Sequence, residues 1–326
     1  MILTLSTHHI LGLPLQEIWF GLIFFILGMF VFLDGFDFGA GIIFAFEDHE
    51  AQEKILAAIG PFWDGNEVWL VVFGGALFAA FPEVYANLFS RNYLLMFAIL
   101  GSLIIRGLAP EFYEQRHDET WQKWWGRAFI FGSTASPFFL GAFTSNWLLG
   151  ATSIVNLPAV VVGAVLVALT VLDGAAFLSV KTDIDVSKYG VISAVAYLGL
   201  LVAGLGYIYV FYPGIRGSLV SPLPLGLVAL SLGLTVIYVY SVSRKRNYVA
   251  FASAAGLAFG LVAYVAAVMF PLVDPATGLR YDEAIVSTLP LNLMTIGSAI
   301  LMPLIFVYFG ILYTTMWGKI ESAEGY

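Results

Sequence analysis

About nine long apolar stretches follow one another along this chain, and each has the length of a membrane-crossing helix. A hydrocarbon core ~30 Å thick needs about 20 consecutive apolar residues in a helix. Hydrophobic residues make up 60% of the chain and charged residues only 11%, and the mean hydropathy is +0.91. These values lie far outside the range of globular domains. We therefore predict an all-α integral membrane protein.

The apolar stretches also set the predicted domain organisation. The connections are short except for 108–125 and 272–285, so no sizeable soluble domain is expected. No Lys or Arg precedes Lys54, and the first apolar run is too long for a signal-peptide core, so we interpret that run as a true span. The predicted spans are, in chain order, 17–46, 53–81, 92–107, 126–147, 152–180, 189–212, 222–243, 248–271 and 286–317.

The cations predict the orientation. Of the 14 Lys and Arg residues, all but Arg91, Arg216 and Arg280 lie at the connections of one side. Cationic connections tend to stay in the cytoplasm. We therefore expect a multi-pass protein of the cell membrane whose N-terminus is outside and whose C-terminus is cytoplasmic. Opposite termini require an odd number of spans, which favours nine over eight.

A short internal repeat indicates two related halves. Leu33-Asp34-Gly35 near the inner end of the first span recurs as Leu172-Asp173-Gly174 near the inner end of the fifth. Each half has an even number of spans, so both run the same way, as in a parallel repeat about an axis along the membrane normal. We expect a first four-helix bundle over 17–147, a second over 152–271 and an additional C-terminal helix over 286–317.

Four carboxylates stand inside the first two predicted spans. A carboxylate at bilayer depth costs roughly 3 kcal/mol on insertion scales unless it is protonated, paired or wetted. Within each helix the acids are three residues apart, and the two pairs lie at similar distances from the connection between the helices. The acids could therefore form one cluster in which not all can ionise, which would suit proton transfer. They are Asp34, Asp37, Asp64 and Glu67.

Structural interpretations of these residues stay open. Asp34, Asp37 and Asp173 could be helix-end or turn residues near the inner headgroups. Gly35 and Gly39 have a GxxxG spacing that permits close helix packing, so Asp34 and Asp37 could simply cross-link a neighbouring helix. Such an interpretation is weaker for the turn-like sequence Asp64-Gly65-Asn66, because apolar segments flank it on both sides.

Three segments resemble one family. They are 33–39 (LDGFDFG), 61–70 (PFWDGNEVWL) and 74–80 (GGALFAA). Together they are similar to signatures of subunit II of the cytochrome bd-type quinol oxidases. Arg106, Met269-Phe270-Pro271 and Leu291-Asn292-Leu293-Met294 resemble the family in matching order. The likeness covers nearly the whole chain, and its specific part is the first half.

The resemblance implies a partner and a division of labour. In the family, a similarly folded subunit I carries the haems and the external quinol site. The haems are haem b with haem d, or b-type haems only. Subunit II stabilises the assembly and lines a cytoplasmic proton route on which Asp64 is the named acid. Some members hold a structural quinone in subunit II. Whether small single-helix accessory subunits join the complex stays open. Membrane lipids and quinone are expected neighbours, and no nucleic acid is implied.

The same resemblance suggests roles for the residues around Asp64. Glu67 takes a place where some members have Gln. Arg106 could pair with an acid, or it could serve only as a positive-inside anchor. The expected proton route comprises Asp64, Glu67, Asp34 and Asp37, and the expected charge partner and motif support are Arg106, Trp63, Asn66 and Asp173.

The sequence offers an independent check on cofactors. It contains no cysteine, and its histidines, His8, His9, His49 and His117, lie in the N-terminal segment or in connections. Haem in membranes is commonly held by His or Met at bilayer depth. The methionines within the apolar stretches stay possible ligands, but single methionines on apolar faces usually serve core packing, so we expect no haem and no metal site on this chain and a haem-bearing partner. We predict subunit II of an oxygen-reducing quinol oxidase that is not catalytic alone. A proton- or cation-coupled transporter and a pure scaffold stay as alternatives.

Overall fold

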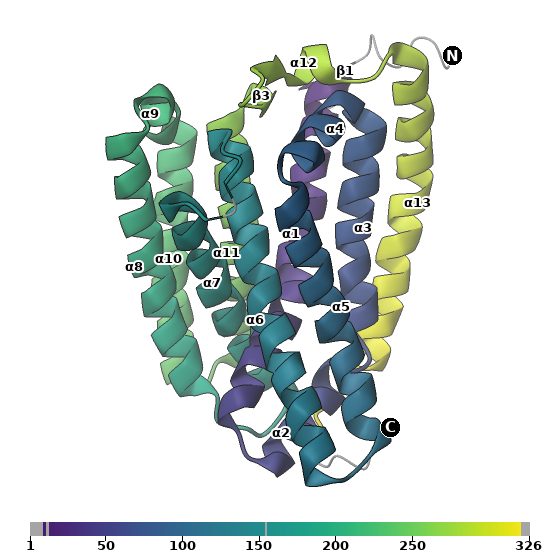
Figure 1. Ribbon diagram of the computed structural model, residues 1–326, viewed down its shortest axis with the longest axis vertical. Helices are drawn as coiled ribbons and strands as arrows, with labels where there is room; N and C mark the ends of the chain where they lie inside the picture. Colours follow the sequence, from purple (N-terminus) through teal and green to yellow (C-terminus); the bar gives the residue numbers. More distant parts are fainter. Residues whose placement is uncertain (1–8, 11–12, 154, 321–326) are drawn as a thin grey trace.

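The computed structural model describes residues 9–10, 13–153 and 155–320, and nearly all of them lie in helices. The long helices run side by side along the longest axis of the molecule (Figure 1). They are α1 (Leu15–Ile43), α3 (Trp63–Ala80), α5 (Tyr93–Gln115), α6 (Glu119–Leu149), α7 (Leu157–Lys181), α8 (Ser187–Phe211), α10 (Pro222–Ser243), α11 (Asn247–Met269) and α13 (Thr288–Thr315).

Within the described residues, seven helices are long and apolar enough to span a membrane. They are the long helices other than α3 and α6. Both of these helices lie among the spanning helices (Figure 1), but α3 has only 18 residues with three polar ones among the first five, and α6 has many polar residues along its length. The all-helical membrane fold is therefore supported, and the count of nine spans stays a prediction.

The second predicted span, 53–81, is not continuous. It is divided into α2 (His49–Ile59) and α3, because Pro61 has no backbone N–H to donate to the helix and its ring clashes with the carbonyl one turn back. Phe62 instead donates its backbone N–H to Ile59 in a tight turn (2.9 Å). The helix α2 is capped by Asp48, which accepts from the backbone N–H of Ala51 at 3.0 Å. The long helix in the place of the second predicted span therefore begins at Trp63.

Short elements close the two ends of the molecule. They include two two-stranded antiparallel sheets, which are too small to change the all-α class. Leu272 pairs with Arg280 and Asp274 with Leu279, with an irregularity between them. The short elements are β1 (His9–Ile10), β2 (Leu13–Pro14), η2 (Phe44–Phe46), α4 (Pro82–Arg91), η3 (Pro213–Ile215), α9 (Arg216–Leu219), β3 (Leu272–Asp274), β4 (Leu279–Arg280) and α12 (Tyr281–Ala284).

The central helix α1 packs against α3, α6, α7 and α11. Its closest approach is to α7, where a Cβ added at Gly39 would lie 1.8 Å from the carbonyl oxygen of Thr170. A Cβ at Gly174 would lie 2.7 Å from the Cα of Gly39. One turn away, the ring of Phe36 stacks on that of Phe177 with centroids 4.1 Å apart. The repeated Asp-Gly motifs therefore meet at one helix crossing.

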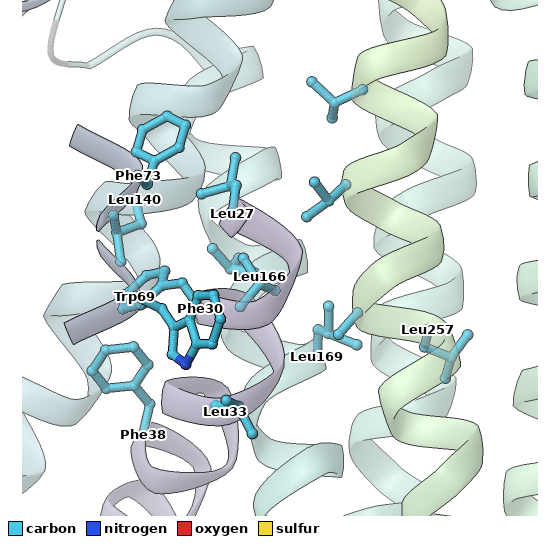
Figure 2. Packing of buried hydrophobic residues seen from close by; sticks show 14 of the residues in the cluster. Leu27, Phe30, Leu33, Phe38, Trp69, Phe73, Leu140, Leu166, Leu169 and Leu257 are labelled. Carbon is cyan, nitrogen blue, oxygen red and sulfur yellow. The ribbon is translucent and has the colours of Figure 1, made fainter. Parts of the chain in front are cut away.

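Large apolar side chains fill the space around α1. Figure 2 shows Phe30 of α1 beside Trp69 of α3 and Leu166 of α7, and all three are buried. The helix α13 lies outside this core and is largely exposed. It is held by side chains, among them Trp19, which donates its indole N–H to Thr295 at 2.8 Å.

Candidate functional site

A buried arginine gathers acids from two helices. Arg106 of α5 is 1% exposed, and its guanidinium lies 3.1 Å from Asp34, 3.5 Å from Asp37 and 3.4 Å from Glu67. Gly132 of α6 makes room for it, since a Cβ there would lie 2.6 Å from the Cβ of Arg106. The sequence left open whether Arg106 pairs with an acid, and the structure pairs it with three.

Two aromatic rings complete the surroundings of Arg106. Its guanidinium carbon lies 5.1 Å from the ring centroid of Phe38 and 5.5 Å from that of Trp63. Aromatic faces attract a cation at this range, most strongly where water is excluded. Trp63, the residue before Asp64, therefore contacts the buried cluster through Arg106.

Asn66 ties the acids to three helices. Its side-chain amide donates to Asp37 at 2.8 Å and to the backbone carbonyl of Leu33 at 3.1 Å. The hydroxyl of Tyr313 in α13 donates to the amide oxygen of Asn66 at 2.9 Å. The spacing predicted that the two acid-bearing segments lie at similar depth. The hydrogen bond between Asn66 and Asp37 joins the two segments at one level.

The cluster holds more acid than its cation can balance. Asp34 and Asp37 are fully buried, and Glu67 is 30% exposed. Both carboxyl oxygens of Asp34 and one of Asp37 accept no hydrogen bond within the described chain, because the ion pair to Arg106 is close but poorly aligned. Three negative charges around one guanidinium at this depth would be very costly. The arrangement therefore favours binding and release of protons.

Asp64 lies apart from this cluster. It is in the first turn of α3 and is exposed. Residues three apart on a helix differ by only about 60° around its axis, so Asp64 and Glu67 lie on adjoining sides of α3: Glu67 reaches Arg106 and is 30% exposed, whereas Asp64 is exposed. Exposed Val68, Val71 and Phe78 continue the same face of α3. The structure thus brings together three of the four predicted acids, and the expected single cluster of four is not formed.

Asp173 of α7 approaches the cluster from the other half of the chain. It is 1% exposed, and one of its carboxyl oxygens lies 3.2 Å from the position of a Cβ added at Gly35. The sequence placed Asp173 in the second half as a lone acid. Its proximity to Gly35 depends on the α1–α7 crossing, which no local pattern indicates.

A polar cavity opens at the end of the molecule that carries α2. It has a volume of about 800 Å³, and Gly60 and Pro61 lie on its wall directly before α3. Nearby, the hydroxyl of Tyr113 and the ring nitrogen Nδ1 of His49 are 3.3 Å apart. Titratable side chains that line the cavity are Glu53, Tyr113, Glu114 and His117. Sequence reasoning did not assign these residues to a site, because Tyr113, Glu114 and His117 belong to the predicted connection 108–125 and Glu53 stands at the very start of the predicted span 53–81.

A second cavity lies mainly between the long helices α1, α3, α5 and α6. It has a volume of about 360 Å³ and an apolar lining that includes Leu27, Phe73 and Trp147. Glu67 is the single acidic residue on its wall. Among the residues that the structure describes, no group of three or more His or carboxylate side chains could hold a metal ion. His8 lies outside the described residues.

Comparisons with known proteins identify a family. A family model described as cytochrome bd terminal oxidase subunit II matches residues 15–316. The chain is 26% identical to cytochrome bd-I ubiquinol oxidase subunit 2 of Escherichia coli K12, over 95% of this chain and 96% of that protein. It is 41% identical over 138 residues to cytochrome bd ubiquinol oxidase subunit 2 of Bacillus subtilis, which is 42% of this chain and 41% of that one.

A solved structure shares the fold. A chain of the bd oxidase from Geobacillus thermodenitrificans superposes with a TM-score of 0.76 at 19% sequence identity. The match covers 94% of this chain and 99% of that chain.

Proposed function

This chain belongs to the cytochrome bd terminal oxidase subunit II family, and from that premise we propose that it is the haem-free subunit II of a quinol:oxygen oxidoreductase. The complex would reduce O2 to water with electrons from quinol. A partner, subunit I, would carry haem b with haem d, or b-type haems only. The observation that carries the proposal is the buried cluster of Asp34, Asp37 and Glu67 around Arg106, with the exposed Asp64 three residues before Glu67 on α3.

We also propose the complete membrane arrangement. Helices α3 and α6 join the seven apolar helices as spans, which gives two four-helix bundles over 17–147 and 152–271 and a peripheral α13 in 286–317. The end that carries α2 would face the cytoplasm, because the cations of the chain concentrate on that side. The N-terminus would then be outside.

The α3–α5 face is the proposed docking surface for subunit I. Asp64 is exposed there within a stripe that includes Val71 (72% exposed) and Phe97 (69% exposed). A carboxylate facing lipid at this depth is costly, so a protein partner that offers polar or basic groups would stabilise it. By contrast, α10 carries no charged residue, and its exposed face suits lipid.

The proposed proton route begins at the cytoplasmic cavity. Gly60 and Pro61 on its wall lead directly to Trp63 and Asp64, and Asp64 on the docking face would pass protons toward the haems of the partner. Glu67, Asp34 and Asp37 would supply further protonatable groups, with Arg106 as their charge partner. Protons taken from inside, with quinol protons released outside, would build a membrane potential.

One variant tests the route. Asp64→Asn keeps the shape of the side chain but cannot carry a proton, so oxidase turnover should fall by roughly 10²-fold, the low end for a positioned proton-transfer group. Haem content should stay normal. Glu83→Gln is the matched control, because Glu83 is an exposed acid at the opposite end of α3. Full turnover in Asp64→Asn would exclude this residue from the route.

The optical spectrum of the reduced complex tests the oxidase assignment. The complex would be purified through a tag on this chain from cells that express all subunits. Haem bands and a co-purifying larger subunit are expected. A colourless preparation of this chain alone would instead favour a proton-coupled transporter.

A further inference from the structure

Asp173 is a buried acid for which the proposed route has no use. It lies on α7 at the crossing with α1, where Gly35 leaves the space that its carboxyl group occupies. It is 1% exposed, and neither carboxyl oxygen accepts a hydrogen bond within the described chain. An ionised carboxylate in such a place needs a cation or several donors to persist.

The cations that could serve Asp173 are already engaged. Lys181 is the other charged residue of α7, but its ammonium group donates to the carbonyl oxygens of Met316 and Gly318 at 2.6 and 2.8 Å. The guanidinium of Arg106 pairs with the three acids of the cluster. No ion pair in the described residues includes Asp173.

The neighbouring hydroxyl groups are engaged as well. Tyr238 of α10 donates to the carbonyl oxygen of Leu172 at 2.7 Å. Tyr313 of α13 donates to Asn66 at 2.9 Å. Gly35, beside which the carboxyl group of Asp173 lies, stands between Asp34 and Asp37 on α1, and both acids carry the same sign. Arg106 stabilises a negative charge on Asp37, so repulsion and desolvation both act against a second charge on Asp173.

We infer that Asp173 is protonated in the resting protein and that Asp37 and Asp173 share one exchangeable proton. The α1–α7 crossing is then a proton store beside the Arg106 cluster. In the exchange, the O–H bond of Asp173 breaks and an O–H bond forms on the carboxylate of Asp37. No electrons move, and the return step restores the first state. The use of the store in oxygen reduction rests on the proposed oxidase function.

Infrared difference spectroscopy of the intact oxidase complex tests this inference. Protonated carboxyl groups have a separate C=O stretching region that shifts in heavy water. Asp173→Asn should remove one carboxyl band from that region while haem content stays unchanged, because Asn resembles a neutral acid in shape. Asp183→Asn is the matched control, since Asp183 is exposed and lies 3.3 Å from the ammonium group of Lys54. It should leave the region unchanged.

The proton exchange between Asp173 and Asp37 is tested by a separate measurement. In the spectrum of reduced minus oxidised complex, the Asp173 band should change position or intensity. An unchanged carboxyl region in Asp173→Asn would overturn the protonated state, and a band that is insensitive to reduction would overturn the exchange. Both outcomes are independent of turnover in Asp64→Asn, which tests the route itself.

A second variant keeps the test valid if Asp173→Asn does not assemble. Gly35→Ala places a methyl group 3.2 Å from the carboxyl oxygen of Asp173, which is tight enough to disturb it without removing it. The carboxyl band should shift in this variant. A band identical to that of the unchanged protein would contradict its assignment to Asp173.

Discussion

The helices of the first half and those of the second half differ most in where they place charge. In the first half, α1, α3 and α5 bring Asp34, Asp37, Glu67 and Arg106 together inside the bundle. In the second half, α10 and α11 carry no charged residue. The buried charges of α7 are Asp173, which has no ion pair, and Lys181, which binds backbone carbonyls.

This difference suggests that related bundles can have separate tasks. Charges are tolerated in the first bundle because Arg106 compensates them and aromatic rings surround it. The second bundle supplies apolar surface, together with the glycine crossing that brings Asp173 toward α1. From this comparison we propose that the first half carries most of the proton transfer and that the second half mainly supports it, with Asp173 as its protonatable contribution.

The largest effect is expected at Arg106. Arg106→Leu would leave Asp34 and Asp37 buried without their cation, which should destabilise the protein by about 3–5 kcal/mol. The recovery of folded complex from membranes should fall steeply, as measured by size-exclusion chromatography of the solubilised protein. Arg106→Lys, which keeps the charge, should recover part of the yield. Equal yields of Arg106→Leu and unchanged protein would contradict a charge-balancing role.

Gly39→Ala should have the next largest effect. The new Cβ would lie 1.8 Å from the carbonyl oxygen of Thr170, so α1 and α7 must separate, at a cost of about 3 kcal/mol, the upper end for overpacking. The thermal midpoint, followed by circular dichroism, should drop. Gly21→Ala is a matched control on the same helix, because nothing lies within 4 Å of its added Cβ. A stable Gly39→Ala would argue against the tight crossing.

Lys181→Met tests the difference between the two halves with a change in the second half. It removes two hydrogen bonds that hold the end of α13, and each bond from a charged donor contributes about 1.5–3 kcal/mol at most. The packing of the Met side chain offsets part of this loss. We expect a moderate decrease in the thermal midpoint and unchanged turnover per haem. A loss of turnover as large as that of Asp64→Asn would mean that Lys181 takes part in proton transfer and is more than a structural residue.

The smallest effect is expected at Lys54. Its ammonium group contacts Glu50 at 3.0 Å and Asp183 at 3.3 Å, but the acids are exposed, and exposed ion pairs contribute little. Lys54→Ala should leave the thermal midpoint and turnover within experimental error. A clear loss of stability would show that the α2 to α7–α8 contact is structurally important.

The sequence predicted which charged residues are buried in the helices better than it predicted their exact positions. Asp34, Asp37 and Arg106 stood out because charged residues within apolar spans are rare and costly, and the structure places them together. Pro61 was a local signal for the break between α2 and α3, but the apolar residues around it masked that signal. A continuous hydropathy pattern does not distinguish one long helix from two shorter ones.

Two features could not be predicted from local patterns. The exposure of Asp64 depends on how α3 is rotated against its neighbours, and the segment around it is apolar except for Asn66 and Glu67. The contact between Gly35 and Asp173 depends on the crossing of α1 and α7, which joins residues more than a hundred positions apart. Both are set by tertiary packing rather than by periodicity.

Proton uptake from the cytoplasmic side tests the central claim most directly. The complex would be reconstituted into vesicles with one orientation, and the pH of the compartment facing α2 would be followed while quinol drives oxygen reduction. We predict rapid alkalinisation of that compartment with the unchanged protein and a markedly slower rate with Asp64→Asn at equal haem content. Equal rates, or uptake from the opposite side, would contradict a proton route through the first half of this chain.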